Sequence, residues 1–398
     1  MMTFLSSRVE KLQESETLAM SRRANELKDS GIDVINMSLG EPDFVTPDFV
    51  KLAAKEAIDK NFSFYTPVPG NKDLLEAISK KFKRDNNLEY KPNQIVVSTG
   101  AKQSIINVVM ATVNPGDEVI LPAPYWVSYI EMVLLNEGKP VVIESDISTE
   151  FKITPAQLEK AITPKTKMFL FSNPSNPTGS MYSEKELRAL GEVFKKHPQV
   201  LIVSDEIYEY ITFEGKMFSI GSIPELQSRT VTVNGLSKGF AMTGWRLGYI
   251  GAPLAVAQAC VKIQGQFTSG TSSITQKAAV AAVNADPSVV TSMREAFHKR
   301  RDLLINLMKE VPHVKTNNPG GAFYLFPEVS YYFGKRDGET VIKDARELCM
   351  YILNKGNVAL TPGGAFGAPN YVRLSYATSE DIIREAVRRI KKALEDLR

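Results

Sequence analysis

The stretch TVTVNGLSKGFAMTGWRLGY, residues 230–249, joins a strand pattern to a loop with an unusual set of side chains. Its first five residues alternate β-branched and polar side chains, which predicts a strand, and Gly235 begins a loop rich in small residues. Ser237 and Lys238 follow, and Arg246 stands between two nearby glycines. A lysine amine can condense with an aldehyde, and an arginine can bind a phosphate through two charge-assisted hydrogen bonds. The stretch therefore suits a phosphate-bearing carbonyl compound, with a surface loop of solvated charges as the alternative.

Strand and helix patterns alternate before this stretch. Strands are predicted at residues 95–97, 118–121, 141–144, 168–171 and 200–204, with a helix at 102–112 after the first. This order predicts a mostly parallel sheet covered by helices. The loop at Gly100 ends a strand and opens a helix, where free N–H groups and the helix dipole favour a phosphate.

The two ends of the chain have a different pattern. Helices are predicted at residues 18–28, 47–58, 72–85, 254–267, 273–285, 288–309, 341–354 and 379–397, and short strands at 34–37, 322–326, 358–360 and 371–375. Thr17 is the expected N-cap of the first helix and Gly31 its expected stop. The C-terminal patterns indicate an α+β unit, and the long charged helix at 288–309 is a candidate bridge between two domains.

Composition excludes several classes of protein. The chain has 398 residues, 43% hydrophobic and 23% charged, with a net charge of +3 that is too small to indicate a nucleic-acid partner. No stretch is long and apolar enough for a membrane span, and no leader pattern opens the chain. The distant cysteines Cys260 and Cys349 indicate no disulfide framework, and the three histidines have no metal-ligand spacing. We expect a cytoplasmic protein without a metal.

Six further motifs occur in an order that resembles one known family. They are SLGEPDF at 38–44, YTPVPG at 65–70, PYWVSY at 124–129, NPSNPTG at 173–179, SDEIY at 204–208 and YVRLSYA at 371–377. Together with SKGFAMTGWRLGY they resemble class I aminotransferases, which use pyridoxal 5'-phosphate, and in particular the bacterial type of aspartate aminotransferase. The resemblance covers nearly the whole chain.

This resemblance implies the fold of pyridoxal-phosphate-dependent transferases of the aspartate aminotransferase type. In it, a large cofactor-binding domain, residues 41–290, has a mostly parallel sheet with helices on both faces. A small α+β domain combines residues 1–40 and 291–398. The active site lies between the domains at the interface of a homodimer, and the substrates are a small amino acid and a 2-oxo acid.

Three residues are expected to carry the chemistry. The resemblance makes Lys238 the lysine that holds the cofactor aldehyde and moves the substrate's α-proton. Asp205 follows an apolar strand, where a carboxylate is costly unless it meets a cation such as a protonated pyridine nitrogen. A helix N-cap is the alternative role for this aspartate. Tyr208 is expected to donate to the ring oxygen, with a packed core tyrosine as the alternative.

Four residues are expected at the substrate. Asn176, in a rigid turn with two prolines, would donate to the ring oxygen and the substrate carboxylate, and Trp126 offers a face for ring stacking, or else packs in the core. The resemblance implies that Arg373 binds the α-carboxylate as a bidentate pair, with a structural salt bridge as the alternative. It also implies that the backbone of Gly40 faces the same carboxylate, which is compatible with a tight turn.

The residues expected at the phosphate are Arg246, Ser237 and the backbone N–H groups of Gly100, Ala101 and Lys102. The resemblance adds Tyr65 of a neighbouring subunit. Some relatives carry a serine three residues before the lysine, where this chain has Gly235.

The expected substrates are aspartate and 2-oxoglutarate. Many aspartate aminotransferases bind the distal carboxylate with a partner-subunit arginine after the lysine loop, but no arginine lies between Arg246 and Arg294. Lys102 and Thr17 match positions that bind this carboxylate in the bacterial type, or else are a solvated helix residue and a cap. The alternatives are an aromatic or broad-range aminotransferase, a lyase on the same scaffold, and a regulator that senses the cofactor. The regulator would need a DNA-binding segment, and the stretch before Gly40 is too short and not basic enough for one.

Overall fold

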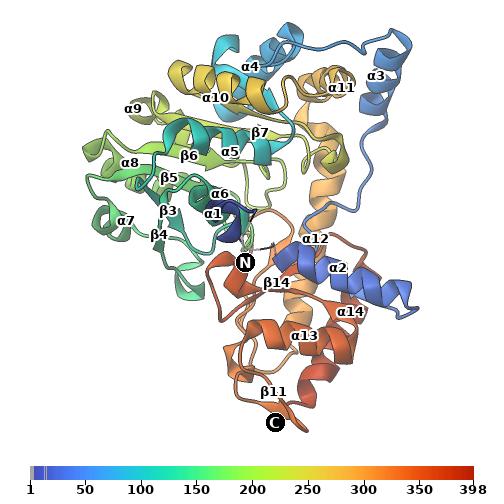
Figure 1. Cartoon of the computed structure of the whole chain (residues 1–398). Coiled ribbons are helices and arrows are strands. Elements are labelled where there is room, and N and C mark those ends of the chain that lie inside the picture. The colour runs from blue at the N-terminus through green and yellow to red at the C-terminus, as the bar shows by residue number, and fades with distance from the viewer. Residues whose placement is uncertain (1–3, 13, 15) are drawn as a thin grey trace.

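A computed structural model describes residues 4–12, 14 and 16–398 of the chain (Figure 1). The α-helices of this part are α1 Ser7–Glu10, α2 Glu16–Asp29, α3 Asp48–Asp59, α4 Lys72–Asn86, α5 Ala101–Thr112, α6 Ser128–Leu135, α7 Pro155–Ala161, α8 Glu184–Lys196, α9 Pro224–Gln227, α10 Leu254–Phe267, α11 Ser273–Asn284, α12 Thr291–Met308, α13 Ala345–Gly356 and α14 Glu380–Glu395. The strands are β1 Ile35–Asn36, β2 Ile95–Ser98, β3 Glu118–Pro122, β4 Lys139–Ile143, β5 Thr166–Ser172, β6 Leu201–Asp205, β7 Thr230–Gly235, β8 Gly248–Gly251, β9 Tyr324–Leu325, β10 Arg336–Asp337, β11 Thr340–Val341, β12 Val358–Ala359, β13 Thr361–Pro362 and β14 Val372–Ser375.

A seven-stranded sheet of order β2-β8-β7-β6-β5-β3-β4 forms the centre of the larger part of the molecule. All its pairs are parallel except those of β8, which runs antiparallel to both β2 and β7. The carboxyl ends of β2, β5, β6 and β7 therefore meet at one edge. Ligands of such α/β sheets bind outside the carboxyl ends of the strands.

Apolar side chains cover both faces of this sheet. Val119 and Leu121 of β3 pack in one cluster with residues of α5, α6 and α10, whereas Ile120 between them packs in another with residues of α7, α8 and α9. Neighbouring residues of a strand point to opposite faces, so a buried strand needs apolar residues throughout. The mostly parallel sheet with helices on both faces is thus confirmed.

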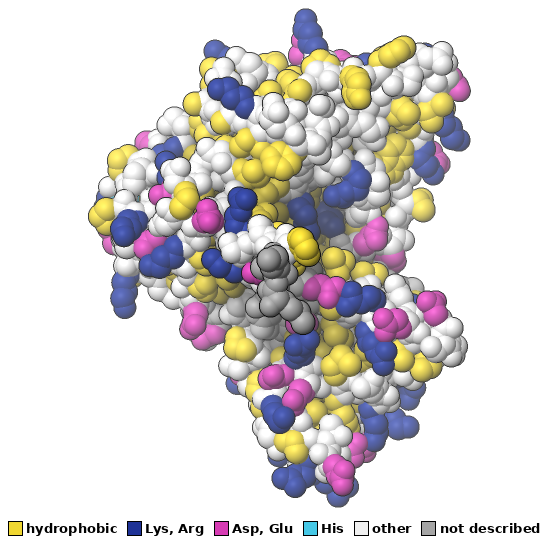
Figure 2. Space-filling view, in the orientation of Figure 1, with side chains coloured by type: hydrophobic (Ala, Val, Ile, Leu, Met, Phe, Trp, Pro, Cys, Tyr) yellow, Lys and Arg dark blue, Asp and Glu magenta, His cyan; other side chains and the backbone are white. Residues whose placement is uncertain are grey.

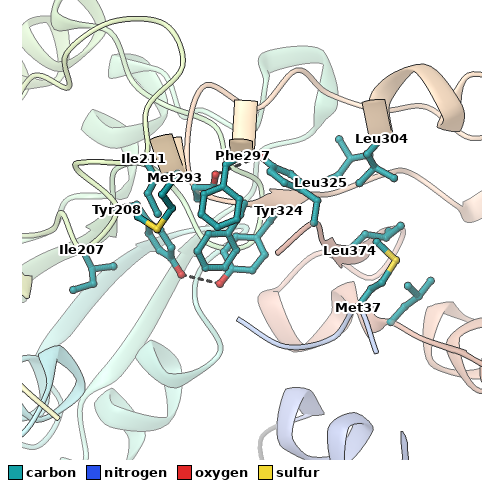
Figure 3. Close-up of a cluster of buried hydrophobic side chains, with 14 of the residues drawn as sticks. Met37, Ile207, Tyr208, Ile211, Met293, Phe297, Leu304, Tyr324, Leu325 and Leu374 are labelled. Carbon is teal, nitrogen blue, oxygen red and sulfur yellow. Dashed lines mark hydrogen bonds between the residues drawn. The ribbon is translucent and has the colours of Figure 1, made fainter. Parts of the chain in front are cut away.

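Strands β1 and β9 to β14 and helices α2, α13 and α14 form a smaller part of the molecule that combines both ends of the described chain. Strand β1 pairs in parallel with β12, and β13, β14 and β9 form a three-stranded sheet. Figure 1 shows α2 beside the C-terminal helices α13 and α14, while α12 runs from the larger part toward them. Met37, Leu304 and Leu374 belong to one buried cluster here (Figure 3).

Several predicted boundaries are corrected. Strand β8 was missed, because its sequence GYIG carries two glycines and few strand-forming side chains. The helix predicted at 341–354 begins only at Ala345, where Asp344 caps it, and α12 begins at Thr291 after a 3-10 turn. Thr17 is not the N-cap of the helix predicted at 18–28, because that helix is α2, which already includes Glu16. Gly31 has φ 85°, as a helix stop with left-handed backbone requires.

Two absences concern only the described part of the chain. None of its helices is both long and apolar enough to cross a membrane. Its two cysteines, Cys260 and Cys349, are buried and unpaired.

Candidate active site

A cavity of about 310 Å³ lies at the carboxyl edge of the sheet and is bordered by both parts of the molecule. It brings together most residues that the sequence predicts for the site: Thr17, Gly40, Ala101, Lys102, Trp126, Asn176, Asp205, Tyr208, Ser237, Lys238, Arg246 and Arg373. Figure 2 shows basic side chains within the hollow at the middle of this face. Gly100 and Tyr65 are not in the lining.

Lys238 lies in the loop after β7 and directs its amine into this cavity. Its Nζ donates a hydrogen bond to the carbonyl oxygen of Gly40, which holds the amine at the boundary between the two parts. Burial lowers the pKa of Lys238 to about 8, with Glu41 acting in the opposite direction. An amine with this pKa is partly neutral near pH 7, as a nucleophile or general base requires.

Asp205 is the last residue of β6 and is buried at the floor of the cavity. Tyr129 of α6 donates a 2.7 Å hydrogen bond to its Oδ2, and the N–H of Ile207 donates to Oδ1 at 3.3 Å. Burial nevertheless raises the pKa of Asp205 to about 6. No α-helix begins at Asp205, so the alternative role of helix N-cap is wrong. A buried carboxylate of this kind is stabilised by a cationic partner.

Tyr129 was missed as a site residue, although it ends the motif PYWVSY. Its ring also packs edge-to-face on Trp126 with the centroids 5.4 Å apart. The only sequence signal was its place one helical turn after Trp126, which is equally typical of a core tyrosine.

Tyr208 and Tyr324 join the two parts of the molecule at the cavity. Their hydroxyl groups lie 2.8 Å apart in a hydrogen bond, and Figure 3 shows the two rings reaching toward each other from separate elements. Tyr324 also explains Gly40, because a Cβ at this position would lie 2.6 Å from the Tyr324 hydroxyl. Tyr324 was not predicted, since only a short strand pattern at 322–326 marked it.

Arg373 of β14 is 2% exposed and faces the cavity. Its Nη1 donates to Oδ1 of Asn176 at 2.9 Å and its Nη2 to the carbonyl oxygen of Ser38 at 2.5 Å. The guanidinium also lies 4.6 Å from the centre of the Tyr324 ring. No carboxylate pairs with it among residues 16–398, so the alternative of a structural salt bridge is wrong. Its Nε is buried without a hydrogen-bond partner in the described structure.

The opposite side of the cavity is formed by the N-terminus of α5. Gly100, with φ 88°, is its N-cap, and the first turn of a helix leaves N–H groups without intrahelical partners. A Cβ at Gly100 would lie 2.6 Å from Nη2 of Arg246, so glycine lets the guanidinium reach this helix end. At Gly235 a Cβ would lie 3.0 Å from Cα of Gly248, which favours glycine over the serine of some relatives. The arrangement can hold a phosphate.

Lys102 and Thr17 line the same cavity from two elements. Nζ of Lys102 lies 4.9 Å above the ring of Trp126, and burial, with a smaller effect of Arg246, lowers the pKa of this lysine. The hydroxyl of Thr17 is buried without a partner in the part of the chain that is described. The amine of Lys102 and the hydroxyl of Thr17 are thus both available to a ligand in this cavity.

Tyr65 stands apart from these residues. Its side chain is fully exposed, at 101%, and it borders a separate surface hollow near Lys277. Within one chain it does not reach the cavity of Lys238. Another cavity, of about 600 Å³, lies between Glu209 and His298, and none of the predicted site residues lines it.

Comparison with known proteins identifies the class of this chain. The model of the family "Aminotransferase class I and II" matches residues 32–390. Over 394 residues the chain is 48% identical to the aspartate/prephenate aminotransferase of Nitrosomonas europaea. This alignment covers 98% of this chain and 99% of that protein. A bifunctional aspartate aminotransferase and glutamate/aspartate-prephenate aminotransferase of Petunia hybrida is also 48% identical, over 98% of this chain and 82% of its own.

Solved structures agree with this class. The aspartate aminotransferase from Rhizobium meliloti superimposes with a TM-score of 0.96 at 42% identity over the whole of both chains. The enzyme from Thermus thermophilus gives a TM-score of 0.93 at 38% identity, over 98% of this chain and all of its own. The chain belongs to the aminotransferase class I and II family. It is accordingly an enzyme that moves amino groups between small amino and oxo acids, and the family implies pyridoxal phosphate.

Proposed function

We propose that the protein transfers the amino group of L-aspartate to 2-oxoglutarate with pyridoxal 5'-phosphate bound at Lys238. The observation that carries this proposal is the placement of Lys238, Asp205 and Arg373 around one cavity that also includes a helix N-terminus. The same cavity offers Lys102 for a second carboxylate. The Thermus thermophilus structure was solved with maleate, a dicarboxylate, and this supports the choice of substrate.

The residues fit the implied cofactor on two observations. Asp205 is a buried carboxylate to which no cationic side chain of the described residues is bonded, and this suits a protonated pyridine nitrogen. The space that Gly100 leaves for Arg246 at the helix end suits a phosphate, with Ser237 and the N–H groups of Ala101 and Lys102 nearby. We assign Tyr208 and Asn176 to the ring oxygen and Trp126 to the ring face.

When bound, pyridoxal phosphate supplies a carbonyl that takes over the amino group and a ring that accommodates the negative charge left at the α-carbon. Arg373 binds the α-carboxylate, because Asn176 and the backbone at Ser38 hold its guanidinium in place and leave Nε free. Nζ of Lys238 accepts the α-proton and would then donate it to the former carbonyl carbon of the cofactor, and its lowered pKa suits both transfers. The carbonyl oxygen of Gly40 accepts a hydrogen bond from that amine and so orients it in the cavity.

We further propose the domain division and assembly that the sequence suggests. The large domain comprises residues 41–290, and the small domain combines 1–40 with 291–398. A homodimer would bring Tyr65 of each chain to the phosphate of the other, which accounts for a fully exposed tyrosine beside exposed Phe64. The compartment is the reducing cytoplasm, in keeping with two buried unpaired cysteines.

One experiment tests the activity and the lysine together. The purified protein is reduced with borohydride and digested, and mass spectrometry is expected to find the cofactor adduct on Lys238. Aspartate with 2-oxoglutarate is expected to give oxaloacetate and glutamate. An adduct on Lys262, or release of ammonia without need of an oxo acid, would refute the proposal in favour of another lysine or a lyase.

Prephenate is a second candidate acceptor. Relatives from Nitrosomonas europaea and Petunia hybrida are named for it. Prephenate is an oxo acid with a second carboxylate. The amine of Lys102 in the cavity, which is proposed for the second carboxylate of aspartate, therefore favours prephenate as well. Measuring glutamate-dependent or aspartate-dependent loss of prephenate would test this candidate directly.

A further inference from the structure

Residues 205–209, at the end of β6 and just after it, direct some side chains to the active site and others to the interior behind it. Asp205 and Tyr208 line the active-site cavity. Glu206 and Glu209 point away from that cavity, and their side chains are buried, with Glu209 only 4% exposed. Two carboxylates therefore lie directly behind two residues of the proposed chemistry, and buried carboxylates need partners.

The partner comes from α4. Lys81 is 1% exposed, and its Nζ donates to Oε2 of Glu209 at 2.5 Å and to Oδ1 of Asn86 at 2.8 Å. Nδ2 of Asn86 in turn donates to Oε2 of Glu209 at 2.8 Å and to Oε2 of Glu206 at 3.5 Å. One buried cation and one amide thus hold both acidic side chains.

Glu206 completes this group without adding a second negative charge. Its Oε1 lies 2.9 Å from the hydroxyl of Ser204 and 2.6 Å from that of Ser219. Burial raises its pKa to about 8, so the carboxyl group is mainly protonated at neutral pH. Lys81 and Glu209 then balance each other. We call Lys81, Asn86, Glu206 and Glu209 the rear network.

The same helix is linked to the loop of Lys238 through Tyr210. The hydroxyl of Tyr210 donates to Oδ2 of Asp85 in α4 at 2.7 Å, and Nζ of Lys81 lies 5.4 Å from the centre of the Tyr210 ring. That ring lies against Gly239, where a Cβ would be 2.6 Å from Cδ2 of Tyr210. Since Gly239 directly follows Lys238, α4 contacts the 205–210 segment directly and reaches the Lys238 loop through Tyr210.

We propose that Lys81 is a positioning residue of the active site: its ion pair with Glu209 fixes the 205–210 segment so that Asp205 and Tyr208 keep their places in the cavity. The inference rests on the proposed function of those two residues. Without the lysine, Glu209 would be a buried charge lacking its cation, and such a loss is strongly destabilising to the local arrangement. The segment would shift, and displacements near 1 Å already impair catalysis.

The test compares three variants as loaded enzymes. Lys81→Met removes the charge and keeps most of the stem, and Lys81→Met/Glu209→Gln removes both charges so that no unpaired ion stays buried. Lys152→Met is the matched control, because Lys152 is a partly buried lysine that pairs with Glu186 at 3.0 Å and lies outside the active-site cavity. For each we measure kcat, the melting temperature and the pH midpoint of the absorption band of the bound cofactor, to which Asp205 and Tyr208 contribute.

Both Lys81 variants are expected to lower kcat by about tenfold to a hundredfold and to displace the absorption midpoint, in line with a small misplacement of catalytic groups. Lys152→Met is expected to lower the melting temperature alone. If Lys81→Met does not fold, the kcat and the absorption midpoint of Lys81→Met/Glu209→Gln decide the test. A folded, cofactor-loaded Lys81 variant with the kcat and midpoint of the wild type would overturn the inference. The proposed function fails separately, if the wild type carries no cofactor on Lys238.

Discussion

The phenol of Tyr129 donates a 2.7 Å hydrogen bond to Oδ2 of Asp205, and both groups are buried. Tyr129 lies on α6, whereas Asp205 ends β6, so the bond ties a helix on one face of the sheet to its carboxyl edge. The bond favours the ionised form of Asp205 and partly offsets the effect of burial on its pKa. It therefore helps to keep the carboxylate charged, as its proposed role requires.

Tyr129→Phe should weaken cofactor binding and turnover. A hydrogen bond to a charged group contributes about 1.5–3 kcal/mol, so we expect a loss on the order of tenfold to a hundredfold in affinity for pyridoxal phosphate. The pKa of Asp205 should rise above its value of about 6 in the cofactor-free protein. Fluorescence titration of the cofactor-free protein with pyridoxal phosphate measures the affinity.

Tyr182→Phe is the control for this variant. Tyr182 is also a buried tyrosine with one hydrogen bond, which it accepts from the N–H of Ile153 at 2.9 Å, and it lies outside the active-site cavity. The Tyr182→Phe variant should lose stability and keep its affinity for pyridoxal phosphate. Equal losses of affinity in both variants would show that Tyr129 serves the core alone.

Glu206→Gln should make the stability of the protein less dependent on pH. Burial raises the pKa of Glu206 from 4.5 to about 8, so the folded protein keeps a proton that the unfolded chain releases between these values. The stability from this group is complete below pH 4.5 and is lost as the pH rises through about 8. The loss is on the order of 1 kcal/mol per pH unit over that window.

Melting temperatures of wild type and Glu206→Gln at several pH values between those limits check this prediction. Glutamine keeps an acceptor for Ser204 and Ser219, so the variant should be the more stable protein, relative to wild type, as the pH increases. A difference in melting temperature that stays constant over the whole range would mean that Glu206 is already ionised in the folded protein.

Tyr65→Phe should weaken cofactor retention although Tyr65 is fully exposed in one chain. If its hydroxyl donates to the phosphate in a partner subunit, the loss should be about tenfold or more in affinity, as for other hydrogen bonds to charged groups. Dialysis against a cofactor-free buffer measures retention, and Tyr331→Phe, at an exposed tyrosine outside the cavity, serves as the control. Sedimentation of the wild type as an active monomer would contradict this prediction.

The order of strands and helices could be predicted from the sequence, because apolar periodicity is a local property. The loop after β7 could be predicted as well. Strand β8 was not, since its two glycines hide the strand pattern. The site contacts of Tyr129 and Tyr324 join segments 76 and 116 residues apart, and the Lys81–Glu209 pair spans 128 residues. No local pattern distinguishes such residues from ordinary core or surface side chains. Their partners become evident only when the sheet brings the segments together.

Lys102 is the expected determinant of substrate choice. Its amine lies in the cavity above Trp126, and no carboxylate forms an ion pair with it in the described part of the chain. Burial and the neighbouring Arg246 lower its pKa, because both disfavour a positive charge there. A substrate carboxylate would relieve both effects. A dicarboxylic substrate therefore has a partner that an alanine or phenylalanine side chain lacks.

Lys102→Met should accordingly lower kcat/KM for aspartate far more than for alanine or phenylalanine. Methionine keeps an apolar stem over the ring of Trp126, so the variant removes mainly the charge. A charged contact in a closed site contributes roughly 2 kcal/mol, which corresponds to about a thirtyfold preference. Steady-state rates with the three donors, each at saturating 2-oxoglutarate, measure this ratio. Equal losses for all three would assign Lys102 to the cofactor or the fold, and an aromatic or broad-range aminotransferase would then describe the enzyme better.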